Sequence, residues 1–264
     1  MSYLLLATLK GVLRDRIFHG MLLVAFLFLF IPSASSFSMR QVTQLAITLS
    51  LSLTSFLLLL LAVFLGGTSL WKDMERRYSH SVLGGTPISR TSYILGKYFG
   101  VSMFVMLTAL LLGILSSVSI WYTATAYPPD SQLLWLNILF AVFFDALKYV
   151  LLVAVAFLLS TVSTSFFLPI FGTITIFLAS SATQEVYNYL QTDQGSQVSA
   201  GIKSTALFFY YILPNFSAFD LKANAIYSLP LDPGVLLLTF CYGVVYITIL
   251  LTSASLLFAR RELL

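Results

Sequence analysis

The chain has 264 residues, of which 59% are hydrophobic and only 9% are charged, and its mean hydropathy is +0.94. Soluble domains carry about 25% charged residues, so this composition excludes an ordinary soluble protein and indicates an integral membrane protein. The formal net charge of +4 comes from basic residues near the ends of the apolar stretches, as membrane topology requires, and does not point to nucleic-acid binding.

Residues 1–19 are expected to form an amphipathic helix at the membrane interface. Apolar residues recur there at helical spacing, with two basic residues one turn apart beside them: Leu6, Leu9, Leu13, Lys10 and Arg14. Helices of this kind lie flat in the interface with the apolar face toward the acyl chains. The alternative is a cleavable signal peptide with its apolar core at 21–31, but the amphipathic pattern before that core favours a retained helix.

Uncharged or nearly uncharged stretches predict six membrane spans, because a helix needs about 20 apolar residues to cross a bilayer. The stretch 131–184 is too long for one crossing. Its hydroxyl-rich part, 160–165, followed by Pro169, is typical of a turn and divides it in two. The expected spans lie near 20–38, 43–68, 93–121, 134–159, 166–184 and 234–258. The predicted fold is one all-α transmembrane domain covering residues 1–264.

The distribution of basic residues predicts the orientation. Six spans place both termini on one side, and basic residues in short loops are retained in the cytoplasm. With cytoplasmic termini, ten lysines and arginines lie inside and three lie outside: Arg40, Lys203 and Lys222. We therefore predict a multi-pass protein of the cytoplasmic (inner) membrane, in contact with membrane lipid, with its N and C termini in the cytoplasm.

The long polar interruption in the first half of the chain, 71–97, lies between the second and third predicted spans. Apolar and aromatic side chains recur in it at spacings of three and four residues: Trp71, Met74, Tyr78 and Val82. This spacing predicts a short amphipathic helix, ended by Gly84 and Gly85, with Thr86 and Pro87 as the cap and first turn of the next helix. The pattern alone fits a solvated cytoplasmic loop and a docking surface for a soluble partner equally well.

Two charged residues, Asp145 and Lys148, lie three positions apart in the fourth predicted span, where they share one helical face. A charge inside the membrane is costly and is by default a sign of function. We favour a structural pair, and the alternative is a place in a substrate or ion path.

No catalytic residue or metal ligand is predicted. Cys241 is the single cysteine, and His19 and His80 have no ligand cluster in the sequence around them. The sequence also lacks a phosphate-binding loop of the Walker type, so the chain is not expected to hydrolyse a nucleotide by itself.

The predicted outer region, 185–232, contains an aromatic run at 206–213 that stops at Pro214. Eight apolar residues are too few to cross a bilayer, so a short re-entrant or interfacial helix is expected. Phenylalanine and tyrosine suit the headgroup zone.

Three parts of the polar interruption, 73–77, 86–90 and 93–97, resemble the loop between spans two and three in ABC-2 type permeases, the membrane subunits of many ATP-binding-cassette exporters. The most specific part is Pro-x-Ser-Arg followed by Gly-Lys. Similarity extends to the amphipathic N-terminal helix, to 213–216 with Phe219 and Asp220, and to a basic tail at 258–262. The chain departs from many relatives in having Arg77, Tyr78 and Ser79 where they have a Gly-Thr pair.

The resemblance implies a non-catalytic permease subunit that exports or flips a hydrophobic or amphipathic substrate. A separate soluble ATPase subunit, in two copies, would bind ATP and Mg, and a second permease chain, identical or related, would complete the pathway. Glu75 and its coupling helix, within residues 71–92, would dock on the ATPase. The implied docking residues are Asp73, Glu75, Arg76, Arg77, Tyr78, Pro87, Ser89 and Arg90.

The resemblance also implies that outer elements help to close the exit of the pathway. The residues concerned are Phe208, Phe209, Tyr210, Tyr211, Pro214 and Asn215. An aromatic anchor without a gating role is the alternative. Two other functional classes stay open: a secondary transporter driven by an ion gradient through Asp145 and Lys148, and an intramembrane enzyme.

Cysteine labelling tests the predicted orientation. In sealed cells, with Cys241 replaced by serine, a Ser79→Cys variant should resist a membrane-impermeant thiol reagent in the medium because residue 79 lies in the predicted cytoplasmic segment. An Arg40→Cys variant, in a predicted outer loop, should react. The mass shift of the purified protein measures both reactions, and modification of Ser79→Cys would contradict the orientation.

Overall fold

The computed structural model describes residues 8, 11, 16–38, 41–75, 89–129, 132–192 and 198–260. Within these residues the regular structure is entirely helical, with no strand. The helices that are long and apolar enough to cross a membrane are α4 (Val42–Glu75), α6 (Arg90–Ala126), α7 (Trp135–Val162), α8 (Phe167–Leu190) and α11 (Pro233–Arg260). Their number, length and composition are those of a multi-pass membrane protein.

The predicted first span, 20–38, differs from the structure. This region is divided into α2 (Arg16–Ala25), a 3-10 helix η1 (Phe26–Phe30) and α3 (Ile31–Ser35), so the described residues contain five membrane-length helices rather than six. Pro32 explains the break, because it has no N–H for the carbonyl of Phe28 and its ring crowds the preceding turn. Ser119 Oγ of α6 donates a hydrogen bond to that carbonyl at 3.5 Å.

The other five predicted spans are present, with longer helices than expected. The predicted break at 160–165 is confirmed, since α7 ends at Val162 and α8 starts at Phe167 with Pro169 in its first turn. α4, however, continues seven residues past the predicted end of its span, from 68 to 75, and α8 continues to Leu190. Helical hydrogen bonding does not require apolar side chains, so hydropathy marks the membrane part of a helix but not its end.

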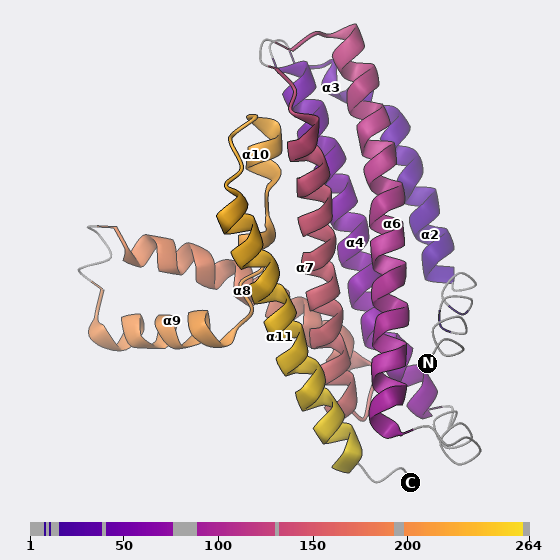
Figure 1. The fold of residues 1–264 in the computed structure, drawn as a ribbon, viewed down its shortest axis with the longest axis vertical. Helices are drawn as coiled ribbons and strands as arrows, with labels where there is room; N and C mark the ends of the chain where they lie inside the picture. The colour runs from indigo at the N-terminus through magenta and orange to yellow at the C-terminus, as the bar shows by residue number, and fades with distance from the viewer. Residues whose placement is uncertain are drawn as a thin grey trace.

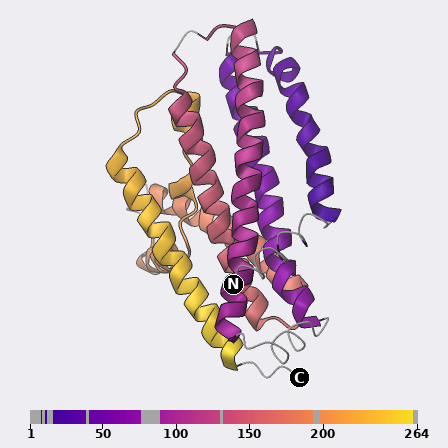
Figure 2. The same cartoon turned by 45° about the vertical axis from the view of Figure 1, so that its right-hand side comes forward.

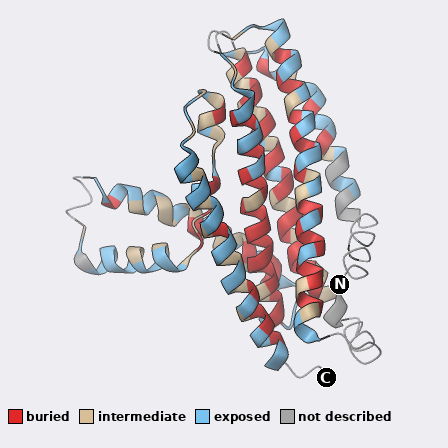
Figure 3. Cartoon of the chain, viewed as in Figure 1, coloured by how far each residue is buried: buried red, intermediate tan, exposed pale blue. Residues whose placement is uncertain are grey.

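α7 is the central helix of the bundle. α4 and α6 run beside it, α11 crosses it obliquely, and α8 leaves the bundle to form a hairpin with α9 (Ala200–Ile212) that projects to the side (Figures 1 and 2). In the most apolar part of each helix, 78% of residues are buried in α7 but only 11% in α11. Figure 3 shows the same contrast, with buried residues along α7 and exposed ones on α11 and the hairpin. The outer helices therefore present apolar faces to lipid or to another chain.

After α9 the chain turns back into the bundle. The stretch 214–230, called the inward segment below, contains the 3-10 helix η3 (Ser217–Phe219) and α10 (Lys222–Ile226), and it packs against α4, α7 and α8. Phe216 and Phe219 are each 1% exposed. The second half of the region 185–232 therefore contributes to the core of the bundle.

Glycines set the close approach of α4 to α7. A Cβ on Gly66 would lie 3.0 Å from Ala156 Cβ and 3.4 Å from Val153 Cα, so there is no room for a side chain between the two backbones. Small residues of this kind let membrane helices approach closely and gain van der Waals contact. Gly113 of α6 has the same role against Val142 of α7, whose Cγ1 would lie 2.8 Å from an added Cβ.

We expect Gly66→Leu to destabilise the bundle by about 1–3 kcal/mol, the usual effect of overpacking, because α4 must move away from α7. Gly201→Leu is the matched control, since a Cβ on Gly201 meets nothing within 4 Å. Thermal unfolding of the two purified variants in the same detergent measures the difference. Equal melting temperatures would show that the close approach at Gly66 does not contribute to stability.

Candidate functional site

A group of polar side chains lies inside the bundle where α4 meets α7. Lys148 Nζ and Asp145 Oδ1 of α7 form a salt bridge, and the two side chains are only 5% and 7% exposed. Ser55 of α4 donates its hydroxyl to Asp145 Oδ1 at 3.1 Å, which leaves Tyr149 Oη as the donor to Ser55 Oγ at 2.7 Å. Lys148 Nζ lies 3.5 Å from Ser55 Oγ and 4.8 Å from the centre of the Tyr149 ring. The pair is neutral and its polar atoms have partners.

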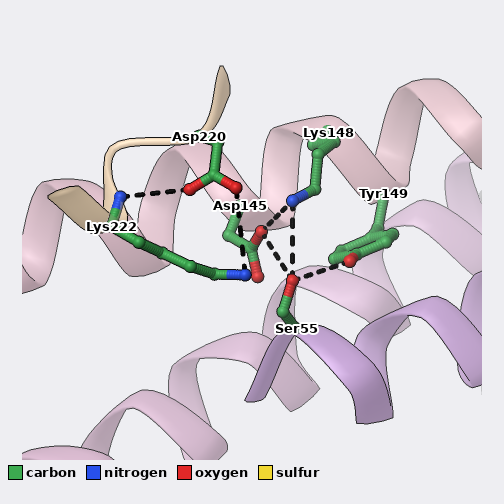
Figure 4. Close-up of polar contacts among 6 residues, drawn as sticks. All are labelled: Ser55, Asp145, Lys148, Tyr149, Asp220 and Lys222. Atoms are coloured by element: carbon green, nitrogen blue, oxygen red, sulfur yellow. Dashed lines mark hydrogen bonds and ion pairs between the residues drawn. The ribbon is translucent and has the colours of Figure 1, made fainter. Parts of the chain in front are cut away.

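A second charged pair comes from the inward segment. Lys222 Nζ lies 3.9 Å from Asp220 Oδ2, and the Lys222 backbone N–H donates to Asp220 Oδ1 at 3.1 Å. Figure 4 shows the side chains of Asp220 and Lys222 directed toward Asp145 and Lys148. We call these four residues the charge cluster. Its formal charges sum to zero.

The depth of the charge cluster follows from helix geometry. Asp145 is ten residues after Trp135, where α7 begins, which corresponds to about 15 Å along the helix axis. This point is close to the middle of the 28-residue helix, so a hydrocarbon core of about 30 Å centred on α7 contains the pair. A pair at this depth has to be neutral to be tolerated. The hydrogen bonds of Ser55 join α4 to α7, as a structural pair would, and a role in a substrate or ion path stays a prediction.

The sequence identified two of the six polar residues that Figure 4 shows. The i, i+3 spacing of Asp145 and Lys148 carried the signal. Ser55 lies 90 positions before Asp145, and Asp220 and Lys222 belong to the predicted outer region, 185–232. No sequence periodicity links residues that are so far apart. The sequence therefore did not predict that these side chains lie near Asp145.

The described docking residues, Asp73, Glu75, Ser89 and Arg90, lie at the end of the bundle where α4 and α11 finish and α6 begins, called the basic end below (Figure 1). Asp73 and Glu75 belong to the last turn of α4, which runs without a break from the predicted second span into the predicted coupling helix. Ser89 caps α6, with its Oγ accepting from Ser92 N at 3.1 Å. Four predicted docking residues lie outside the described residues: Arg76, Arg77, Tyr78 and Pro87. The glycines at 84–85 and Thr86 also lie outside them.

At the basic end, α6 is tied to α4 and α11. Arg90 Nη1 donates to the carbonyl of Ala259 at 3.0 Å, and the ring of Tyr93 stacks on Phe258 with centroids 6.5 Å apart. Lys97 is buried, and its Nζ donates to the Ser69 carbonyl of α4. Lys97 therefore belongs to the helix contacts rather than to a solvated loop.

At the same end, Trp71 of α4 packs against Phe166, in the turn between α7 and α8, with ring centroids 5.6 Å apart. On the N-terminal side, a Cβ added to Gly100 of α6 would lie 2.8 Å from Thr8 Cβ, which places Thr8 against α6. Apart from Thr8, Gly11 and 16–19, the predicted interfacial helix at 1–19 lies outside the described residues. The basic end is thus a set of helix ends held together by specific contacts.

The aromatic residues predicted for an outer gate lie on α9, which begins six residues before the predicted run. Phe208, Phe209 and Tyr211 are exposed on the projecting hairpin. Tyr210 stacks on Tyr187 of α8, with ring centroids 4.1 Å apart and planes inclined by 7°. These rings hold α9 against α8, and no described contact places them over the charge cluster.

Pro214 and Asn215 have a different setting from the aromatic run. The Pro214 carbonyl accepts from Ser180 Oγ of α8, and Asn215 N donates to Tyr242 Oη of α11 at 2.8 Å. Asn215 Nδ2 also donates to Gln184 Oε1 of α8 at 2.6 Å. Pro214 and Asn215 therefore fix the start of the inward segment between α8 and α11.

An apolar groove of about 540 Å³ lies between α6 and α7 on the outside of the bundle. Trp121 and Trp135 lie near the ends of the two helices, as expected for side chains at a membrane interface, and the hollow below them is lined by small residues such as Gly113 and Ala146. In the described part of the chain, no three His, Cys, Asp or Glu residues are grouped to hold a metal ion.

A scan of the sequence against protein-family models gives no match, and a search among curated proteins finds no similar sequence. The contacts described above are therefore the basis on which a function can be argued.

Removing one partner of the buried pair should harm the protein more than removing both. Lys148→Leu leaves Asp145 buried without its cation, which should destabilise the fold by about 3–5 kcal/mol. The double variant Asp145→Leu with Lys148→Leu should be closer to the parent, because no buried charge is left. Melting temperatures in detergent compare the three proteins. A double variant less stable than Lys148→Leu would contradict a structural pair, and a stable double variant that has lost transport would indicate a substrate or ion path.

Proposed function

We propose that the chain is the permease subunit of an ATP-binding-cassette exporter of the ABC-2 type. The observation that carries this proposal is the continuity of the two helices that flank 76–88. α4 passes from the membrane part of the chain through Asp73 to Glu75, and α6 begins at Ser89 and Arg90. The residues that resemble the ATPase-docking loop of these permeases therefore lie on, or between, two long unbroken helices.

Continuous helices make an effective mechanical connection. α4 and α6 have 34 and 37 residues, or about 51 and 56 Å at the usual rise per residue, against a hydrocarbon core of about 30 Å. A displacement applied at Glu75 or Arg90 is then transmitted along each axis instead of being absorbed by a loop. The contacts of Arg90 with Ala259 and of Lys97 with Ser69 pass the same displacement to α11 and between α4 and α6.

The proposed assembly contains two copies of a soluble ATPase and a second permease chain, identical or related. ATP and Mg belong to the ATPase, and the permease contributes no catalytic residue. The ionic residues near Glu75 pair with the surface of the ATPase. The exposed apolar faces of α8, α9 and α11, together with the groove between α6 and α7, are surfaces for lipid and for the second chain. The substrate is a hydrophobic or amphipathic molecule that is exported or flipped.

In this proposal the basic end faces the cytoplasm and the protein lies in the cytoplasmic membrane. Lys72, Arg90 and Arg260 belong to the ends of α4, α6 and α11 that form the basic end, in agreement with the rule that basic residues are retained inside. The consecutive elements α2, η1 and α3 provide the sixth crossing, which returns both termini to one side. The inward segment, which includes α10, then lies in the outer half of the membrane.

Charge reversal at Glu75 tests the docking role. Glu75→Lys should abolish transport and reduce co-purification of the ATPase by at least about tenfold, the effect of losing roughly 1.4 kcal/mol at the interface. Membrane insertion should be unchanged, because Glu75 lies at the end of α4. The measurements are quantitative mass spectrometry of subunits retained by the tagged, detergent-extracted permease, and export of any small molecule that co-purifies.

Glu185→Lys is the matched control, since it reverses an exposed acidic residue on α8, away from the basic end. It should retain the ATPase and transport. Equal recovery of the ATPase with Glu75→Lys and with the parent, together with unchanged export, would refute the assignment. A complex that contains no protein with a Walker motif would favour a secondary transporter.

A further inference from the structure

A pocket of about 320 Å³ lies between the end of α9, the start of the inward segment and α11. Small-molecule sites have volumes of about 300 to 1,000 Å³, so this one has room for a headgroup rather than for a whole amphiphile. The described residues that line it carry no charge, and four of them are tyrosines: Tyr210, Tyr211, Tyr242 and Tyr246. We call it the tyrosine pocket. None of its lining residues belongs to the charge cluster.

The rings around the tyrosine pocket are inclined to one another. The planes of Tyr210 and Tyr211 are inclined by 73° with centroids 5.4 Å apart, and those of Tyr242 and Tyr246 by 51° with centroids 5.6 Å apart. One face of Tyr210 is covered by Tyr187 of α8, so only its other face and its edge are left for the pocket. Inclined rings surround a space on several sides, whereas parallel rings form a flat wall. An aromatic cage, which binds a cation through the negative faces of its rings, has the first arrangement.

Several polar atoms of the tyrosine pocket are already used within the protein. Tyr246 Oη donates to the Ile212 carbonyl, and Tyr242 Oη accepts from Asn215 N at 2.8 Å. Asn215 Oδ1 accepts from Ala218 N at 3.2 Å. These bonds hold the two rings of α11 against the end of α9, and they engage groups that a sugar or another strongly hydrogen-bonding ligand would need. The pocket therefore offers a ligand aromatic surface more than hydrogen bonds.

The tyrosine pocket lies where an amphiphile can reach it from the membrane. α11 has 28 residues, or about 42 Å, so a hydrocarbon core of about 30 Å centred on it leaves about 6 Å at each end. Leu238 lines the pocket five residues after Pro233, about 8 Å from the start of α11, and its side chain is 72% exposed. The pocket therefore lies near the boundary between headgroups and acyl chains. A ligand with its head in the pocket keeps its chain beside the exposed apolar face of α11.

We propose that the tyrosine pocket binds the quaternary ammonium group of an amphiphilic molecule through cation–π contacts. A metal ion or a primary ammonium group needs oxygen partners when it leaves water, and no described lining residue is acidic. A quaternary ammonium group has no N–H to satisfy, and aromatic faces are the surface by which proteins recognise it. Choline lipids and free quaternary ammonium amphiphiles share this chemistry. Binding here needs neither an ATPase nor a second chain, so it is independent of the proposed transport function.

Protection of a cysteine in the tyrosine pocket measures its occupancy. The full-length protein carries Cys241→Ser and, at a lining residue, Thr239→Cys, and it is purified in dodecyl maltoside, a detergent without a cation. Its reaction with N-ethylmaleimide is followed by mass spectrometry at increasing concentrations of octyltrimethylammonium, and the rate should fall to a plateau. Octylammonium has the same charge and chain, and the isostere with carbon in place of nitrogen has the same shape without the charge. Both should protect at least about tenfold less well, a difference of about 1.4 kcal/mol.

Substitutions of Tyr211 test the role of the ring face. Its side chain is 73% exposed, so they should leave the fold intact. Tyr211→Leu should weaken protection by octyltrimethylammonium about tenfold, whereas Tyr211→Phe keeps the aromatic face and should bind within about twofold of the parent. Phe208→Leu is the matched control and should bind as the parent does, because Phe208 is 60% exposed on the same helix but is not among the lining residues.

Nanodiscs distinguish the two sources of the quaternary ammonium group. If it belongs to a lipid, Thr239→Cys should react more slowly in phosphatidylcholine than in phosphatidylethanolamine–phosphatidylglycerol nanodiscs, and Tyr211→Leu should remove the difference. Equal rates in the two nanodiscs, with protection by octyltrimethylammonium retained, would assign the pocket to a free amphiphile.

Three results would overturn the proposal. One is no protection by octyltrimethylammonium, or equal protection by octylammonium or by the isostere. Another is the same affinity in Tyr211→Leu and in the parent. The third is an equal loss in Tyr211→Phe and Tyr211→Leu, because the hydroxyl and not the ring face would then hold the ligand. The first comparison leaves all four tyrosines in place, so it decides the question even if a Tyr211 variant does not accumulate.

Discussion

The structure depends on the neutralisation of charge at the centre of the bundle. α7 carries Asp145 and Lys148 near its middle, where an unpaired charge is costly in a membrane, and it contacts all four of the other membrane-length helices. The salt bridge makes this helix compatible with the membrane, and Ser55 and Tyr149 complete its hydrogen bonds. α4 must therefore lie where Ser55 reaches the pair, and Gly66 allows the two backbones to approach closely further along. The hydrogen bonds of Ser55 and the close packing at Gly66 thus fix the same interface between α4 and α7.

The two ends of the bundle are organised differently. At the basic end, helix termini contact each other directly, through Arg90 and Ala259, Tyr93 and Phe258, and Trp71 and Phe166. At the opposite end, α7 meets the short elements of the inward segment through the side chain of Asn137. The bundle therefore has direct contacts between long helices at one end and short elements at the other, an asymmetry that fits the proposed transport function with force entering on one side.

Much of the helical framework could be predicted from residues that act locally. Pro214 ends α9 because the residue before a proline is restricted to extended backbone, and Leu213 has φ −80° and ψ 145°. The turn after α7 follows from clustered hydroxyl residues and Pro169 in the same way. Pro32 is also a local signal, but the apolar residues around it favoured one continuous span. The break in the helix was therefore not predicted. The position of Asp220 near the bundle had no such signal, because it depends on how far the chain returns inward after α9.

The 3-10 stretch near the N terminus bears on bilayer thickness. α2, η1 and α3 have 10, 5 and 5 residues, so the helical run contains 20. A 3-10 helix rises about 2.0 Å per residue against about 1.5 Å in an α-helix, which brings the run to about 33 Å. That length barely exceeds a typical hydrocarbon core, whereas α4 and α6 are several turns longer. As the proposed sixth crossing, this run would be the first to be strained by a thicker membrane, and hydrophobic mismatch would then act on the protein through α2, η1 and α3 rather than through its core.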